Sequence, residues 1–176
     1  MNVISPIKNI EEINLIKDLY LRKKQISELL MFTLAINTGI DLSALLNLKI
    51  EDVKNKFYLL VAPQKSIPID DGTRRLIAEF IVGKLNSDFL FKNKKGKKVD
   101  RTTVFYSFKN ICSELGLSEK YSVASWRKTF AYHYYMKYKD LSYLQWLFNQ
   151  GTVKQTLNFI GVDENMNLRF REGVEL

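Results

Sequence analysis

The sequence predicts a mostly helical domain that contains one small antiparallel β-sheet. Apolar residues recur at helical spacing over most of the chain, and several of these runs open at a capping residue. Two short runs, 57–61 and 66–70, are instead rich in aromatic and β-branched residues and are separated by a segment that fits a turn. Hydrophobic residues make up 46% of the 176 residues. This share is enough for one hydrophobic core and argues against disorder.

The first part of the chain is expected to be helical. Asn9, with Glu12 three residues later, predicts a capping box at the start of a helix that ends in the basic run 21–24. A second helix is expected to end at Gly39, because glycine takes the left-handed conformation with little strain. A short helix over about 43–48 then precedes the two strand-like runs.

The sheet and the remaining helices follow. Pro68 has no amide hydrogen to give to a central strand, so the second strand-like run is expected at an edge of the sheet. The segment from Asp71 opens the next helix, and a basic loop at 92–98 comes after it. Further helices are predicted at about 102–115, 123–138, 141–150 and 152–160. The chain is expected to form one domain over residues 1–162, with a tail at 163–176.

Charge and rare residues limit the class of protein. Lysine and arginine number 27 against 19 acidic residues, a formal net charge of +8. This bias favours a polyanionic partner, with nucleic acid first and an anionic membrane surface second, although many basic proteins bind neither. Cys112 and His133 are the only residues of their types, so we expect no internal disulfide, no metal site and no cofactor. The sequence has no signal-peptide pattern and no apolar run of membrane-spanning length, so we expect a cytoplasmic protein.

Two segments resemble conserved boxes of the tyrosine recombinases, the phage integrase family. Residues 38–48 read Thr-Gly-Ile-Asp-Leu-Ser-Ala-Leu-Leu-Asn-Leu and are followed by an acidic pair, a pattern similar to the family's first box. Residues 125–133 read Ser-Trp-Arg-Lys-Thr-Phe-Ala-Tyr-His and resemble the family's His-x-Leu-Arg-(His/Lys)-Thr-Phe box. Order and spacing agree from about residue 7 to residue 162. The resemblance implies the tyrosine-recombinase catalytic-domain fold, mostly α with a small antiparallel β-sheet, without the family's usual N-terminal core-binding domain.

The same resemblance assigns positions to the family's catalytic groups. The changed positions are Asp41, Ala124, Gln150 and Phe159; Arg127 is retained beside Lys128, and Lys65 is the candidate for the hairpin lysine. Phe159 stands where the resemblance places the nucleophilic tyrosine, and phenylalanine has no hydroxyl to attack a phosphodiester. Asp41 stands in place of an arginine and would repel a phosphate. The sequence therefore predicts a protein that is not an enzyme, a catalytically inactive relative of the tyrosine recombinases.

A basic surface is expected to contact DNA. Residues 92–101 carry five lysines and one arginine against one aspartate, a net charge of +5. The predicted DNA-contacting residues are Lys92, Lys94, Lys95, Lys97, Lys98, Arg101, Thr102, Thr103, Tyr106, Lys109, Arg127 and Lys128. Such a basic run is also typical of a solvated loop.

Arg127 and a group of tyrosines have two interpretations each. Arg127 either binds phosphate or pairs with a buried carboxylate such as Asp41. The tyrosines between 132 and 138 form either a half-buried helix face or a platform on which bases stack. His133, on the same helix, is expected to be a packed structural residue.

These expectations define the predicted function. The protein is predicted to bind double-stranded DNA without cutting it, as a regulatory or accessory factor of a phage or other mobile element. An active recombinase, or another protein of that element, is a second expected partner. Two alternatives stay open: an active site-specific recombinase with an unrecognised nucleophile, and a protein-interaction module that does not bind DNA.

Overall fold

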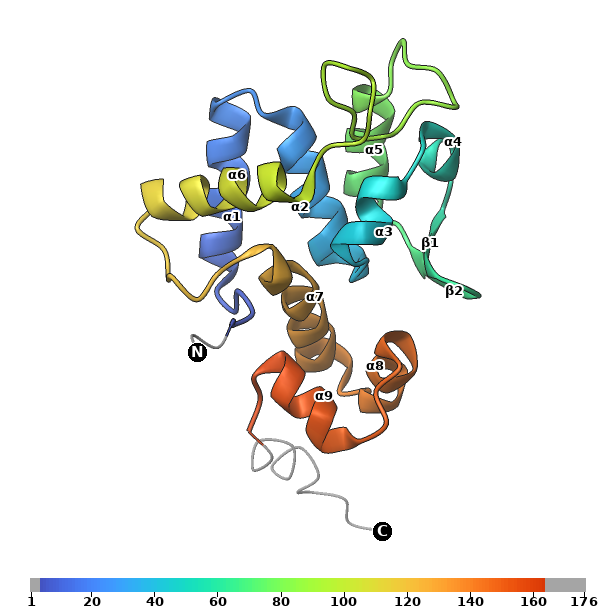
Figure 1. Ribbon diagram of the computed structural model, residues 1–176. Coiled ribbons are helices and arrows are strands. Elements are labelled where there is room, and N and C mark those ends of the chain that lie inside the picture. The colour runs from blue at the N-terminus through green and yellow to red at the C-terminus, as the bar shows by residue number, and fades with distance from the viewer. Residues whose placement is uncertain (1–3, 164–176) are drawn as a thin grey trace.

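Helices and one β-hairpin make up the computed structural model, which describes residues 4–163 (Figure 1). In chain order the elements are α1 (Ile10–Arg22), α2 (Ile26–Thr38), α3 (Leu42–Asn47), α4 (Ile50–Val53), β1 (Tyr58–Ala62), β2 (Lys65–Pro68), α5 (Asp71–Phe80), α6 (Arg101–Glu114), α7 (Val123–Tyr138), α8 (Leu141–Phe148) and α9 (Val153–Ile160). The predicted fold class is confirmed. Residues 164–176 of the expected tail lie outside the described range. Within that range, every helix is too short or too polar to cross a membrane.

The central helix α2 is buried over most of its length. Every residue from Leu29 to Ile36 is buried, and α1, α3, α5 and α7 pack around the helix (Figure 1). The Phe32 ring stacks on Phe108 of α6 at 5.8 Å between centroids, and Trp126 of α7 meets both rings edge-on. Because neighbours cover this helix all round, its apolar residues are not confined to one stripe.

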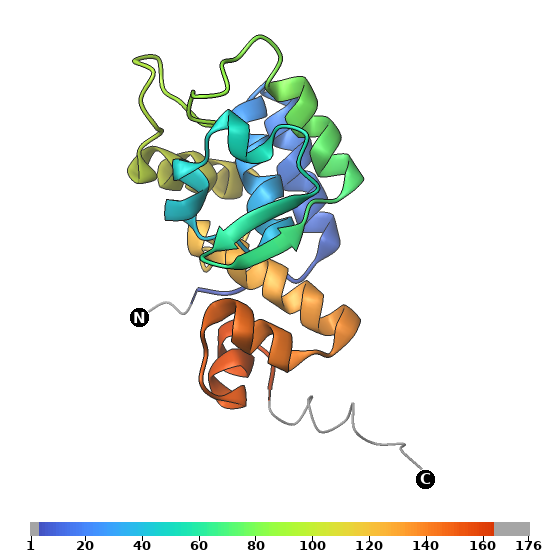
Figure 2. The same ribbon diagram turned by 90° about the vertical axis from the view of Figure 1, so that its right-hand side faces the viewer.

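The β-hairpin has two strands, so both strands are edges. β1 and β2 pair antiparallel with Tyr58 opposite Pro68, and the register shifts between Leu60 and Ala62. Leu59 points into the core whereas Tyr58 and Leu60 are exposed, the alternation that a pleated strand imposes. Pro68 therefore lies in an edge strand, as predicted. Figure 2 shows the hairpin lying across the domain above α7 and α8.

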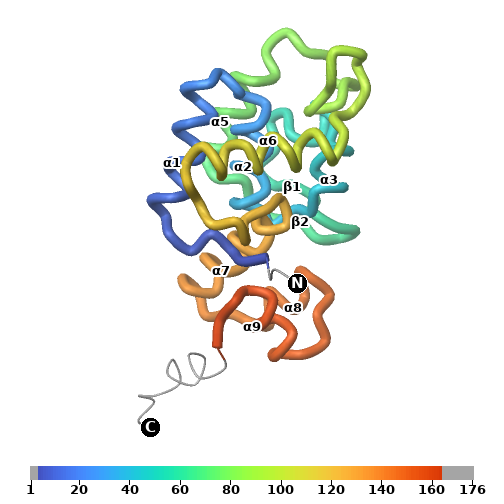
Figure 3. The backbone as a smooth tube through the Cα atoms, turned by 60° about the vertical axis from the view of Figure 1, so that its left-hand side comes forward, coloured from blue at the N-terminus to red at the C-terminus, as the bar shows by residue number. Residues whose placement is uncertain are grey.

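The segment before α1 is tied to the last third of the chain. The Ile7 amide donates a hydrogen bond to Thr129 Oγ1 at 2.9 Å, and the Ile7 carbonyl oxygen lies 3.0 Å from His133 Nε2. Lys8 Nζ donates to the Gly161 carbonyl at 2.7 Å. Figure 3 shows this segment passing alongside α7. The structural role expected for His133 is confirmed by its contact with the Ile7 backbone.

The capping box predicted for α1 is wrong. Asn9 does cap the helix, since its side chain accepts a hydrogen bond from the backbone at 2.8 Å. The Glu12 carboxylate, however, accepts a hydrogen bond from the Tyr121 hydroxyl at 2.7 Å. The hydrogen bond between Glu12 and Tyr121 takes the place of the local hydrogen bond from the Asn9 amide that a capping box requires.

Two further differences concern short helices. α8 ends at Phe148, earlier than predicted, because Asn149 takes a left-handed conformation with φ +54°. α4 was not predicted, because a helix of one turn gives no periodicity to detect.

Gly39 is expected to tolerate no side chain. It ends α2 with φ +66°, and a Cβ there would lie 2.6 Å from Phe130 Cδ1. Gly39→Ala combines left-handed strain with a clash against a buried ring, so it should lower the free energy of unfolding by roughly 2–4 kcal/mol. Gly116→Ala is the matched control: Gly116 has φ +63° and open space around a Cβ, and should lose only about 1 kcal/mol. Urea denaturation measures both, and equal losses would mean that the Phe130 ring moves aside.

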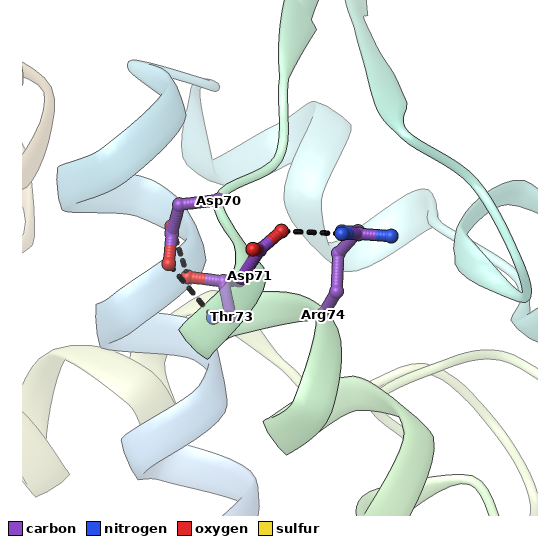
Figure 4. A network of polar contacts seen from close by, with 4 residues as sticks. All are labelled: Asp70, Asp71, Thr73 and Arg74. Carbon is purple, nitrogen blue, oxygen red and sulfur yellow. Dashed lines mark hydrogen bonds and ion pairs between the residues drawn. The ribbon is translucent and has the colours of Figure 1, made fainter.

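Asp70 couples stability to pH at the start of α5. Its carboxylate accepts hydrogen bonds from Thr73 N at 2.9 Å and Thr73 Oγ1 at 2.5 Å (Figure 4), and from Asn37 Nδ2 at 3.0 Å. Burial raises the pKa of Asp70, but the hydrogen bonds from Thr73 and Asn37 outweigh burial and hold that pKa below its ordinary value of 3.8. The contribution to stability is therefore complete above pH 3.8 and is lost as the pH falls through the lower, folded-state value.

Asp70→Asn is expected to be less stable than the wild type at neutral pH, and the difference should shrink in acid. Thermal melts of both proteins between about pH 7 and about pH 2 measure this difference. A difference that stays constant over that range would show that the charge of Asp70 makes no contribution.

Candidate functional site

Arg127 and Phe159, two of the positions that the resemblance assigns to catalytic groups, are joined through Phe148 where α7, α8 and α9 pack together. The guanidinium carbon of Arg127 lies 4.5 Å from the centroid of the Phe148 ring, and Phe148 packs against Phe159 at 5.2 Å between centroids. Lys128 Nζ lies 5.3 Å from the Phe159 centroid. These four residues, Arg127, Lys128, Phe148 and Phe159, form an aromatic–cation cluster. Phe148 was not predicted, since a phenylalanine in an apolar helix gives no signal of its own.

Asp41 caps α3 and forms no ion pair with Arg127. Asp41 Oδ1 accepts a hydrogen bond from Ala44 N at 2.9 Å. Arg127 is absent from the ion pairs found among residues 4–163. Burial lowers the pKa of Arg127, and the charge of Asp41 opposes that shift through space. The direct pairing that the sequence suggested is therefore not formed, although the two charges influence each other.

Two of the positions that the resemblance assigns carry a buried polar atom without a hydrogen-bond partner in the part of the chain that the structure describes. The atoms are Arg127 Nε and Gln150 Oε1. An unpaired buried donor or acceptor is unfavourable until a partner reaches it. Ala124, one turn before Arg127 on α7, is exposed and contributes no polar group. Arg127 thus keeps a donor, and Gln150 an acceptor, in need of partners.

Lys65 binds the carboxyl end of α8. Its ammonium donates hydrogen bonds to the Trp146 carbonyl and, at 2.6 Å, to Asn149 Oδ1, and it lies 5.1 Å from the Trp146 ring centroid. A cation at the C-terminus of a helix also interacts favourably with the helix dipole. The candidate hairpin lysine therefore joins the hairpin to the helix that carries Phe148.

The basic loop 92–98 forms an exposed turn. Asn93 Oδ1 accepts hydrogen bonds from the amides of Lys95 and Lys97, at 2.9 and 3.1 Å. An isolated bridge between Lys92 and Lys98 closes the base of the loop. The turn is therefore fixed by hydrogen bonds from its backbone amides to the Asn93 side chain, and its lysines are exposed.

The cations of this region fall into two groups. Those at the base of the loop are bound: Lys92 pairs with Asp88 at 2.6 Å, Lys98 donates to Asn47 Oδ1 at 2.8 Å, and Arg101 donates to Ser43 Oγ. Lys94, Lys95 and Lys97 are exposed, and their ammonium groups have no bonded partner among residues 4–163. These three lysines are the ones available to an anionic partner.

The first turns of α6 lie next to this loop in the chain. Asp100 caps the helix by accepting a hydrogen bond from Thr102 N at 2.8 Å, and Thr102 and Thr103 are exposed. Tyr106 is 60% exposed and packs edge-on against Phe105 at 5.4 Å between centroids. The helix start thus presents hydroxyl groups and aromatic rings to solvent.

Two of the lysines predicted to contact DNA bind carbonyl groups inside the protein. Lys109 Nζ donates to the carbonyls of Glu119 and Tyr121, at 2.9 and 3.0 Å. Lys128 Nζ donates to the Ile4 carbonyl at 3.0 Å, and burial lowers its pKa. Both lysines therefore hold neighbouring loops in place.

The tyrosines of α7 form a mostly packed face. Tyr135 is fully buried, and Tyr134 stacks on Tyr143 of α8 at 4.7 Å between centroids. Tyr138 is exposed and contacts Tyr134 at 4.8 Å between centroids. This packing agrees with the half-buried interpretation.

Comparison with known proteins identifies the family. The sequence profile described as the Phage integrase family matches residues 7–165. This chain belongs to the phage integrase family. A relative named Probable integrase/recombinase YoeC, from Bacillus subtilis (strain 168), is 29% identical over 171 residues, which cover 94% of this integrase-family chain and 93% of that protein.

Solved structures share the fold of this integrase-family chain. XerA recombinase has a TM-score of 0.77 at 16% identity, and the match covers 97% of this chain and 65% of that chain. The Tn1549 transposon integrase, in complex with circular intermediate DNA, has a TM-score of 0.78 at 14% identity and covers 99% and 66%. A lambda integrase dimer bound to a COC' core site has a TM-score of 0.69 at 19% identity and covers 98% and 50%. This integrase-family chain thus spans half to two thirds of these solved chains.

The prediction that this protein is not an enzyme is wrong. It rested on the changed residues at positions 41, 124, 150 and 159. The phage integrase family is a family of enzymes, its Bacillus subtilis relative is named a probable integrase/recombinase, and the solved structures of the same fold are recombinases and integrases. Differences at individual side chains do not establish inactivity.

Asp41 is expected to stabilise α3 through its cap. Asp41→Ala removes the acceptor for Ala44 N and should lower the free energy of unfolding by about 1 kcal/mol. Asp41→Asn keeps a capping oxygen and should stay within about 0.5 kcal/mol of the wild type. Urea denaturation of the two variants separates the cap from the charge. Equal destabilisation by both would assign the effect to the negative charge beside Arg127.

Proposed function

We propose that this member of the phage integrase family binds double-stranded DNA and acts as a regulatory or accessory factor in the recombination of a phage or other mobile element. Family membership supports a role in recombination. Structures of the same fold include XerH recombinase bound to its difH substrate and the Tn1549 integrase bound to circular intermediate DNA. The formal net charge of +8 also favours a polyanionic partner.

The three exposed lysines of the basic loop carry this proposal. Lys94, Lys95 and Lys97 are exposed on a turn whose backbone amides bind the Asn93 side chain. The turn comes just before the exposed start of α6. Clustered cations that meet DNA phosphates release condensed counterions, which favours binding at low salt. The competing interpretation, a merely solvated loop, predicts no effect of these lysines on DNA affinity.

Residue 159 supplies no nucleophile in this proposal. Phe159 has no hydroxyl, and its ring packs against Phe148. Strand cleavage by this chain would therefore need a different attacking group. A suicide DNA substrate that traps covalent adducts, followed by peptide mapping, tests this directly. An adduct would identify the attacking residue and would show a recombinase with an unrecognised nucleophile.

Lys94→Gln/Lys97→Gln is expected to weaken DNA binding for all sequences alike. If each lysine meets one phosphate, the slope of log affinity against log salt should become less steep by about 0.9 per lysine removed. Fluorescence anisotropy with a labelled duplex, between about 50 and 200 mM salt, measures affinity and slope together. Folding should not change, because both side chains are exposed.

Arg22→Gln/Lys24→Gln is the matched control. It removes the same charge from exposed positions at the end of α1, and its effect on the slope should be clearly smaller. Equal effects of the two variants would mean that overall charge, and not the loop, attracts DNA. Unchanged affinity in the loop variant would remove the loop from the interface and favour the protein-interaction alternative.

A further inference from the structure

A cleft of about 480 Å³ lies between α4, the start of β1 and α5. Its volume is in the range of small-molecule sites, roughly 300–1,000 Å³. One part of its lining is apolar, with Val53, Ile77 and Ile81, and the other part is charged. None of its lining residues belongs to the aromatic–cation cluster or to the basic loop 92–98. The cleft is therefore a feature that the proposed DNA binding does not use.

Arg74 is the most constrained cation of this cleft. Its guanidinium carbon lies 4.3 Å from the centroid of the Phe57 ring, and it forms an ion pair with Asp71 (Figure 4). Its Nε atom is buried, and no hydrogen-bond partner for it is found in residues 4–163. Stacking on the ring thus orients a guanidinium that keeps an unused donor. Planar guanidinium groups bind oxyanions through paired hydrogen bonds.

The charged part of the lining is cationic overall. Lys56 and Arg75 are exposed, and no bonded partner of either side chain is found in the described residues. Asp71 is the one carboxylate among the lining residues, so three cations and one anion leave a net charge of +2. Figure 4 shows Asp71 turned toward Arg74, whereas the neighbouring Asp70 is turned toward Thr73 and belongs to the cap of α5. Side-chain hydrogen bonding from Arg74 lowers the pKa of Asp71, which is therefore ionised at neutral pH.

We propose that this cleft binds a phosphate monoester, with the phosphate among Lys56, Arg74 and Arg75. A phosphate monoester carries about −1.5 to −2 charges at pH 7, which matches the net charge of the lining. A phosphate of the DNA backbone carries a single charge and matches it less well. The organic part of the ligand lies against the apolar wall and the Phe57 ring, which is 62% exposed. An aromatic group such as a nucleobase suits that ring.

Calorimetric titration of the full chain at low ionic strength tests this proposal. The probes are adenosine monophosphate, inorganic phosphate and adenosine. Adenosine monophosphate should bind most tightly and adenosine should not bind measurably. Lys56→Gln/Arg75→Gln should weaken binding of the monophosphate roughly tenfold, because two exposed charges are removed. Arg22→Gln/Lys24→Gln, which lies outside the lining, should leave the affinity unchanged.

Asp71→Asn provides a test of opposite sign. Removing this carboxylate frees Arg74 and removes a repulsive charge, so the monophosphate should bind about threefold more tightly. A purely structural role of the Asp71–Arg74 pair would weaken binding instead. The proposal is overturned if the monophosphate does not bind, or if Lys56→Gln/Arg75→Gln binds it as the wild type does. A third outcome also overturns it: the monophosphate fails to bind, and Lys56→Gln/Arg75→Gln loses affinity for DNA. The cleft would then belong to the DNA-binding surface of the protein.

Discussion

The burial of α2 over most of its length is the constraint on which the packing of the neighbouring elements depends. A helix that is buried from Leu29 to Ile36 must be covered by other elements, and α1, α3, α5 and α7 provide that cover. Phe32 anchors the contact by meeting the rings of Phe108 and Trp126 from two other helices. Gly39 then lets the chain leave α2 without striking Phe130. Helix α7 packs against this core and also carries Arg127 and Lys128. The position of the candidate site therefore depends on the packing of the core.

Local signals in the sequence predicted most of the helices. Caps such as Asn9 and left-handed stops such as Gly39 depend on a few neighbouring residues, so they can be read from the sequence. The capping box failed for the opposite reason, because Glu12 found Tyr121 at a separation of 109 residues. Contacts of that kind depend on the completed fold, and no periodicity encodes them.

The candidate site was only partly predictable. The resemblance located Arg127 and Phe159, but it could not show that Phe148 stands between them and contacts both. Nor could it show that Asp41 directs its carboxylate to the backbone of α3. The cleft beside α5 cannot be predicted from the sequence, because its charged residues lie on separate elements that only the fold brings together. Family membership was recovered, whereas the inference from changed residues to a non-enzyme was wrong.

The segment 4–9 forms hydrogen bonds with residues that are synthesised long after it. The partners of Ile7 and Lys8 lie 122, 126 and 153 residues later in the sequence. Ile7 is fully buried in the folded domain and its backbone partners lie on α7, so it cannot be buried in this way until α7 has been synthesised. Contacts between residues so far apart in sequence form late. Closing the long loop between them first costs conformational entropy, and the contacts offset that cost only once they have formed. The apolar Ile7 side chain therefore stays exposed until α7 is in place, and a nascent chain with exposed apolar groups can aggregate.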